Sequence, residues 1–275
     1  MRLCDMSFKK LIVLIIACLF CFKGIHAQEF SMGIHFSPIA TIPMMAKPPV
    51  TNHPSLKAKK YNINASAGLN FNYRFKRLCI ETGGNITTRS ITFRMNLDEY
   101  SYNSLGGSSS ISSYSDTRSS GYAIGIPLQV GYLLDKHDAK TVYDFYGLLG
   151  ASYEMHTTLA YAYGAGVTSQ SGNSITNNRN FYPGSGVQTN WINIIAGFKI
   201  NAILRHVGLI EYGLRYHFPL SHAGQYHVET VVSNGAYGSV FTGDFYPRLA
   251  YMDFHFTYYF LSYEKGAGRK KYRYN

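Results

Sequence analysis

The segment from Tyr122 to Leu134 alternates large apolar side chains with small or polar ones, and this alternation restricts the fold more than any other feature of the chain. The large positions are Tyr122, Ile124, Ile126, Leu128, Val130, Tyr132 and Leu134, and those between them include Ala123, Gly125, Pro127, Gln129 and Gly131. Successive side chains of a β-strand point to opposite faces, so a strand here has one apolar face and one small or polar face. Its length is about that of a tilted strand that crosses a bilayer.

The same alternation recurs along the rest of the chain. The further segments are 30–37, 61–75, 78–89, 143–154, 192–201, 210–218 and 250–260. Pro38 and Pro43 are expected to end the first of them, because proline cannot donate a hydrogen bond to a neighbouring strand. Together the segments predict about eight strands.

Short links and long polar stretches alternate between these strands. The short links are Lys76-Arg77, Asp135 to Lys140 and Arg205-His206. The long stretches are the segment that leads to Lys60, residues 95–117 and 157–187, and the segment that leads to Phe245, and all four are expected to be surface loops. Short periplasmic turns and long external loops are typical of outer-membrane barrels, and this arrangement places both termini in the periplasm.

The apolar face is too bulky to fill the inside of a soluble eight-stranded barrel, which has room only for modest side chains. The opposite face carries many glycines, which suit a narrow interior. The 24 Tyr and 17 Phe supply aromatic girdles for the two lipid interfaces. The sequence therefore predicts an all-β fold: a closed antiparallel transmembrane β-barrel.

The first residues have the features of a secretory signal, with Lys9 and Lys10 before an apolar run and a small residue, Ala27, at the expected cleavage point. Residues 15–18 offer an alternative, a lipoprotein box with Cys18 as the acylated residue. Cleavage after Ala27 leaves Cys79 as the last cysteine, so no internal disulfide is expected. The predicted organisation is a signal peptide at 1–27, an outer-membrane barrel at 28–262 and a basic periplasmic tail at 263–275.

The net charge of +11 favours contact with anionic surfaces, but nucleic acid is not an expected partner of an exported chain. Charged residues of both signs fall on the predicted inner face. They are Arg74, Glu81, Arg89, Asp144, Glu154, Lys199, Glu211, Arg215, Asp253 and His255, with His35 and His217 beside them. Buried charges must pair, so we interpret this set as a salt-linked network that fills the barrel.

A catalytic site is the alternative interpretation of the inner face. Asp253 and His255 are two residues apart and share a face, as a general acid or base and its partner would. The sequence indicates no nucleophile beside them, and Cys79 alone does not suggest a metal site. We therefore expect no enzyme activity, no metal and no cofactor.

Several segments resemble the PorT-like outer-membrane β-barrel proteins of Bacteroidota-type bacteria. They are Ala67-Gly68-Leu69-Asn70-Phe71, Ile126-Pro127-Leu128, Phe145-Tyr146-Gly147 and the aromatic last strand, which ends at Phe260. The resemblance implies an envelope or secretion-associated role, with secretion-machinery proteins as partners. It also implies that the aromatic end at Phe260 acts as an insertion signal.

The expected function is a structural, binding or assembly role in the outer membrane, without pore activity. Outer-membrane lipid and lipopolysaccharide are the expected lipid partners. Two alternatives stay open: a small barrel enzyme that acts on outer-membrane lipids, and a surface receptor or adhesin. The tyrosine-rich loops, with Tyr161, Tyr163, Tyr182 and Tyr237, have the amphipathic composition of recognition surfaces and favour the receptor alternative.

Overall fold

The structure is a computed structural model. It describes residues 29–52, 54, 56–96, 114–136, 143–156, 163–170, 173–183, 189–204, 208–234 and 237–264. The predicted signal peptide, most of the predicted loop at 95–117 and nearly all of the basic tail lie outside these residues. No helix in the described part of the chain is long and apolar enough to cross a membrane.

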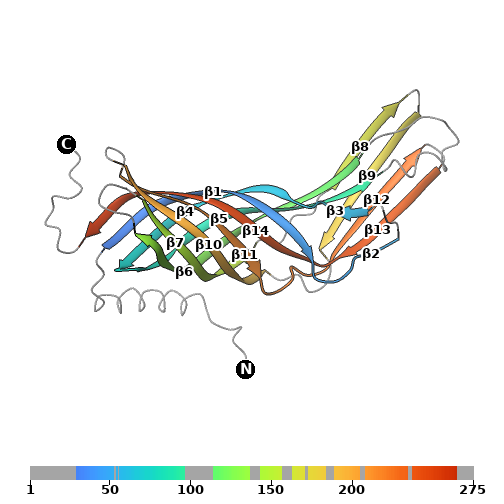
Figure 1. Ribbon diagram of the computed structural model, residues 1–275. Coiled ribbons are helices and arrows are strands. Elements are labelled where there is room, and N and C mark those ends of the chain that lie inside the picture. Colours follow the sequence, from blue (N-terminus) through green and yellow to red (C-terminus); the bar gives the residue numbers. More distant parts are fainter. Residues whose placement is uncertain are drawn as a thin grey trace.

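Eight antiparallel strands form a closed barrel, which confirms the predicted fold (Figure 1). They are β1 (Glu29–Met45), β4 (Asn62–Phe75), β5 (Leu78–Asn96), β6 (Tyr114–Lys136), β7 (Tyr143–His156), β10 (Asn190–Leu204), β11 (Gly208–Pro219) and β14 (Pro247–Glu264). The order around the barrel is β5-β4-β1-β14-β11-β10-β7-β6, and pairing of β6 with β5 closes it.

The alternation of the sequence determines which face of each strand points outward. On β6, Tyr122, Ile124 and Leu128 are at least half exposed, whereas Ala123 and Gln129 are buried. Pairing of Leu128 with Ala151 on β7 keeps the outward positions of neighbouring strands together. The barrel therefore has an apolar outer wall and a mainly polar interior.

The predicted hairpin at Lys76-Arg77 is also present. Phe75 pairs with Leu78 across this two-residue turn, and Lys76 adopts a positive φ of 50°. We call this end of the barrel the turn end. Glu29 of β1 pairs with Glu264 of β14 there, so both barrel termini lie at the turn end. The opposite end is the loop end.

A second sheet of five strands extends from the loop end, on the right in Figure 1. Its order is β2 (Val50–Thr51), β13 (Tyr237–Phe245), β12 (Tyr226–Asn234), β9 (Asn173–Pro183) and β8 (Tyr163–Gln170). The short strand β3 (Leu56–Ala58) pairs with β5. The expectation that the segments up to Lys60, from 157 to 187 and up to Phe245 are irregular loops is therefore wrong. Backbone pairing forms these strands even though their Gly-, Ser- and Asn-rich composition has a low strand propensity.

An apolar core joins the second sheet to the mouth of the barrel. It comprises Leu56, Ile91, Phe93, Trp191, Ala223, Tyr226, Val228, Phe241, Phe245 and Leu249. The rings of Phe93 on β5 and Phe245 on β13 lie 4.5 Å apart between centroids. The polar interior thus changes to an apolar one at the loop end, and this core covers the mouth.

The first strand continues past both prolines, contrary to the prediction that Pro38 and Pro43 end it. The β1–β14 pairing skips Ser37 and Pro38 and resumes at Ile39, so the missing N–H of Pro38 costs no hydrogen bond to β14. The strands β5 and β6 also extend beyond the predicted bounds, to Asn96 and from Tyr114.

Candidate functional site

Lys199 forms the centre of the charged network inside the barrel. Its ammonium pairs with Glu81 of β5 and lies 2.7 Å from Oε2 of Glu211 on β11. Each of the three side chains is no more than 1% exposed. A single cation from β10 therefore compensates two buried carboxylates. One comes from a strand that precedes β10 in the sequence, and the other comes from the strand that follows it.

Glu211 has two further partners on the last strand. The hydroxyl of Tyr259 donates to its Oε2 at 2.8 Å, and Nε2 of His255 lies 3.2 Å from its Oε1. Asn70 of β4 in turn donates to the Tyr259 hydroxyl at 3.0 Å. These contacts link β4, β11 and β14 across the interior.

Asp253 connects the centre with the loop end. Nε of Arg215 donates to Oδ1 of Asp253 at 3.0 Å, and Nε2 of His217 lies 3.1 Å from Oδ2. Nδ1 of His255 lies 3.7 Å from Oδ1, and the ring of His35 lies 6.2 Å from that of His255. Arg215 and His217 are thus side chains within hydrogen-bond distance of this carboxylate.

A second carboxylate cluster lies nearer the loop end. Arg89 donates to both oxygens of Glu154, at 3.0 and 2.8 Å, and its guanidinium lies over the ring of Tyr251 at 3.6 Å. The Tyr251 hydroxyl donates to Glu154 at 2.6 Å, and His156 contacts the same carboxylate at 3.0 Å. The His156 ring lies 3.6 Å from that of Trp191, so this cluster borders the apolar core.

Arg74 forms the end of the network at the turn end. Its Nη1 lies 3.1 Å from Glu29 and 3.2 Å from Asp144. The side-chain amide of Asn201 lies between Arg74 and Glu211 and bonds to both when its nitrogen faces Glu211. The network therefore extends along the barrel from the turn end to the apolar core.

The structure brings every predicted member of the interior network into a contact with another member. Sequence reasoning missed Glu29, His156, Tyr251 and Tyr259. Each of them occupies an inward position in the alternation of its strand. Tyr251, for example, lies two residues before Asp253 and shares its face. Continuing the pattern to the strand ends would therefore have found them.

The interior contains a small polar cavity. A cavity of about 20 Å³ is lined by residues that include His35, Asn85, Arg215 and His217. Nε2 of His35, Oδ1 of Asn85 and Nδ1 of His217 have no hydrogen-bond partner in the described part of the chain. A buried space of this size and polarity suits a single water molecule.

The Asp253–His255 pair, the alternative catalytic candidate, is enclosed inside the barrel. Both side chains are 2% exposed, and their polar atoms face Arg215, Glu211 and His217. No group of three His, Cys, Asp or Glu side chains that could hold a metal ion occurs among the described residues. Cys79 is buried beside Leu133 and Tyr146 in a small apolar cluster.

The outer wall exposes large apolar side chains on each of the eight barrel strands. Examples are Ile34, Leu69, Ile86, Leu128, Leu149, Ile194, Tyr212 and Phe256. Exposed tyrosines stand toward both ends of the strands, such as Tyr61 and Tyr122 toward the loop end and Tyr132 and Tyr143 toward the turn end. These are the positions that the predicted aromatic girdles would occupy.

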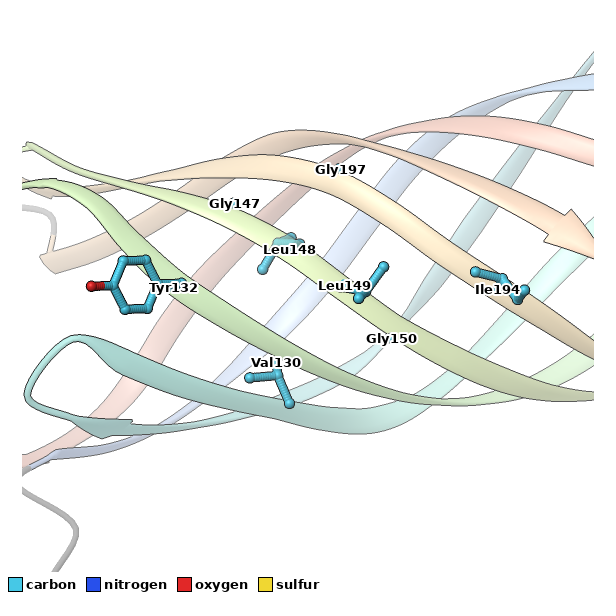
Figure 2. Close-up of a pocket in the computed structure, with 8 residues that line it drawn as sticks. All are labelled: Val130, Tyr132, Gly147, Leu148, Leu149, Gly150, Ile194 and Gly197. Carbon is cyan, nitrogen blue, oxygen red and sulfur yellow. The ribbon is translucent and has the colours of Figure 1, made fainter.

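The wall has a shallow depression of roughly 660 Å³, shown in Figure 2. Tyr132 and Phe198 pair with Gly147 from either side, and the glycine has no side chain to fill the space between them. Val130, Leu149 and Ile194 form other parts of the lining. The depression is apolar and faces away from the charged interior.

No family model matches the chain, and no curated protein matches it. Among solved structures, the chain is similar to the outer membrane protein OprG from Pseudomonas aeruginosa, with a TM-score of 0.42 and 9% sequence identity. The match covers 86% of this chain and 97% of that one. The resemblance to PorT-like proteins stays a prediction.

Proposed function

We propose that the protein is a non-porin barrel of the outer membrane with a structural, binding or envelope-assembly role. One observation carries the proposal: the eight-stranded barrel exposes an apolar wall while its interior is filled with paired charges. A soluble protein rarely exposes an apolar surface of this extent, because water contact with it is unfavourable. The hydrocarbon of a bilayer removes that cost.

The proposed orientation places the turn end in the periplasm. Both barrel termini and the Lys76-Arg77 turn lie at this end, whereas the five-stranded sheet extends from the other. Short turns on the periplasmic side and large external segments are the general pattern of outer-membrane barrels. The second sheet is then exposed to the cell exterior.

The closed interior supports the proposal that no solute passes. The narrow lumen of eight strands can be filled by side chains. Here Arg89, Lys199 and Arg215 are each 6% exposed or less and fill the centre with their carboxylate partners, and the apolar core covers the mouth.

Planar-bilayer conductance of the purified protein tests this proposal. We expect no stable channels, whereas a general porin reconstituted in the same way conducts. Reproducible large openings would show a water-filled lumen and would refute the non-porin role. Fractionation tests the location separately, because recovery of the protein in the soluble fraction without detergent would refute the membrane placement.

An assembly role with envelope or secretion-machinery partners is the narrower form of the proposal, and it depends on the PorT-like resemblance. We propose that this role is non-catalytic, and burial of Asp253 and His255 supports that view. Crosslinking in intact envelopes followed by purification should recover a specific periplasmic or secretion partner. Release of acyl chains from lipid by the purified protein would instead favour an enzyme.

The five-stranded sheet favours a surface receptor as a second candidate function. Its strands pack on the apolar core through Tyr226, Val228, Phe241 and Phe245, so it is a folded extension of the barrel. Deletion of residues 163–183 removes the edge strand β8 and its neighbour β9. Loss of ligand binding by cells that still insert this shortened barrel would support the receptor function.

A further inference from the structure

A group of cations at the loop end has no carboxylate partner. Lys47, Lys59, Lys60 and Arg248 form no ion pair with any acidic residue that the structure describes. The interior cations differ, because Arg74, Arg89, Lys199 and Arg215 each contact a carboxylate at close range. We call the four unpaired residues the basic collar.

Strand pairing brings Lys60 and Arg248 to one sector of the barrel, and Lys59 lies beside it, where its backbone N–H donates to the carbonyl of Thr92 on β5 at 2.7 Å. Arg248 of β14 pairs with Met44 of β1. Asn62, which lies two residues after Lys60, pairs with Thr41 of β1. Neighbouring strands lie about 4.8 Å apart, so the backbones at Lys60 and Arg248 are separated by about two strand spacings.

Lys47 continues the same sector toward the second sheet. The backbone N–H of Ala46 donates to the carbonyl of Tyr246 at 2.8 Å, and the Lys47 ammonium lies 5.3 Å from the ring centroid of Tyr246. Arg248 lies two residues after Tyr246 in the chain. Lys47 thus stands on the same side of the barrel as Arg248.

The collar lies at the edge of the apolar wall. Tyr61 follows Lys60 directly and is 57% exposed, and Ile63, two residues after Tyr61, is 73% exposed. The guanidinium of Arg248 lies 5.8 Å from the ring centroid of Phe218. Long cations and aromatic rings at the end of an apolar belt are typical of the headgroup region of a membrane, where the charged ends reach toward the polar layer.

One collar atom is a hydrogen-bond donor without an acceptor. Nε of Arg248 is buried and has no hydrogen-bond partner in the described part of the protein. An arginine side chain presents several N–H groups in a planar fork that matches phosphate oxygens. A phosphate held between the outer N–H groups of the Arg248 guanidinium and the neighbouring lysine ammoniums would accept hydrogen bonds and balance the positive charge, whereas the buried Nε would not take part.

We propose that the basic collar binds the phosphate group of an anionic lipid in the external leaflet. The inference depends on the proposed membrane placement, because the apolar wall below Tyr61 and Ile63 would hold the acyl chains while the collar holds the headgroup. The phosphate belongs either to a phosphorylated glycolipid of the lipid A type or to a phosphodiester phospholipid. Both offer the same chemistry to the collar.

Native mass spectrometry of the folded barrel, titrated with defined lipids, tests the proposal. The probes are bisphosphorylated lipid A, its fully dephosphorylated form and phosphatidylglycerol. We expect the wild-type protein to bind at least one phosphorylated lipid at least tenfold more tightly than the dephosphorylated one. The variant Lys59→Gln/Lys60→Gln should weaken that binding about 30-fold, since each lysine near an anionic surface contributes a factor of about five.

The control is Lys76→Asn/Arg77→Gln at the turn end, which removes the same charge far from the collar. Asparagine tolerates the positive φ at position 76. We expect this variant to bind all three lipids as the wild type does. Equal binding by the collar variant and the control, or equal binding of phosphorylated and dephosphorylated lipid by the wild type, would overturn the collar site.

The lipid preference identifies the source of the phosphate. Tighter binding of lipid A indicates a glycolipid monoester, and tighter binding of phosphatidylglycerol indicates a phospholipid diester. Insertion into vesicles, measured by the heat-dependent mobility of the folded barrel in gels, is recorded for every variant. A wild-type protein that does not insert refutes the membrane placement, whereas insertion without a preference for phosphate refutes the collar alone.

Discussion

Replacement of Lys199 by Met tests the charged network at its centre. Methionine has nearly the length of lysine but no charge, so the substitution leaves Glu81 and Glu211 facing each other without their shared cation. Both carboxylates are no more than 1% exposed and cannot recover hydration in the folded barrel. Breaking a buried ion pair in this way costs about 3–5 kcal/mol.

A loss of that size lowers the ratio of folded to unfolded protein by roughly two to four orders of magnitude. The only tryptophan of the chain, Trp191, is 4% exposed at the mouth of the barrel, and its fluorescence reports unfolding in urea. We expect the free energy of unfolding to fall by at least 3 kcal/mol in vesicles at pH 8. The loss should be smaller at pH 4, since protonation of a carboxyl group removes the uncompensated charge.

Two further variants separate the charge effect from packing. The triple variant Lys199→Met/Glu81→Gln/Glu211→Gln removes all three charges and should recover most of the lost stability, because no buried charge then lacks a partner. Arg77→Met removes a cation from the exposed turn and should change stability by less than about 0.5 kcal/mol. A Lys199→Met protein as stable as the wild type, or a triple variant no better than the single one, would refute the proposed role of Lys199.

Two other predictions concern the outer wall and the close approach of strands. Leu128→Arg places a charge on the lipid face of β6 and should lower the free energy of unfolding in vesicles by about 2–4 kcal/mol. Val240→Arg, at a similarly exposed position on β13 outside the barrel, should lower it by less than about 1 kcal/mol. Equal losses in urea unfolding would show that the membrane does not surround the barrel. Gly83→Ala should destabilise the barrel by about 1–3 kcal/mol, because its Cβ would overlap the carbonyl oxygen of Leu69. Its neighbour Gly84 has open space around an added Cβ, so Gly84→Ala should be nearly neutral, and a reversed order of the two melting temperatures would contradict the geometry.

The alternation along each strand was sufficient to predict the barrel and the facing of its residues. A strand repeats every two residues, so facing is a local property that needs no knowledge of neighbouring strands. Tyr122 and Leu128 are outward and Gln129 is inward, as predicted. The network members could be named for the same reason, since Glu81, Lys199 and Glu211 each occupy an inward position of their own strand.

Only the tertiary structure decided which of these charges pair and what covers the mouth. Lys199 meets Glu81 although the two are 118 positions apart in the sequence, because strand register and barrel closure set that contact. The second sheet was missed because its segments have a weak alternation and become strands through pairing, as β12 does between β9 and β13. Local sequence determines the direction of a side chain, whereas register around a closed barrel determines what it meets.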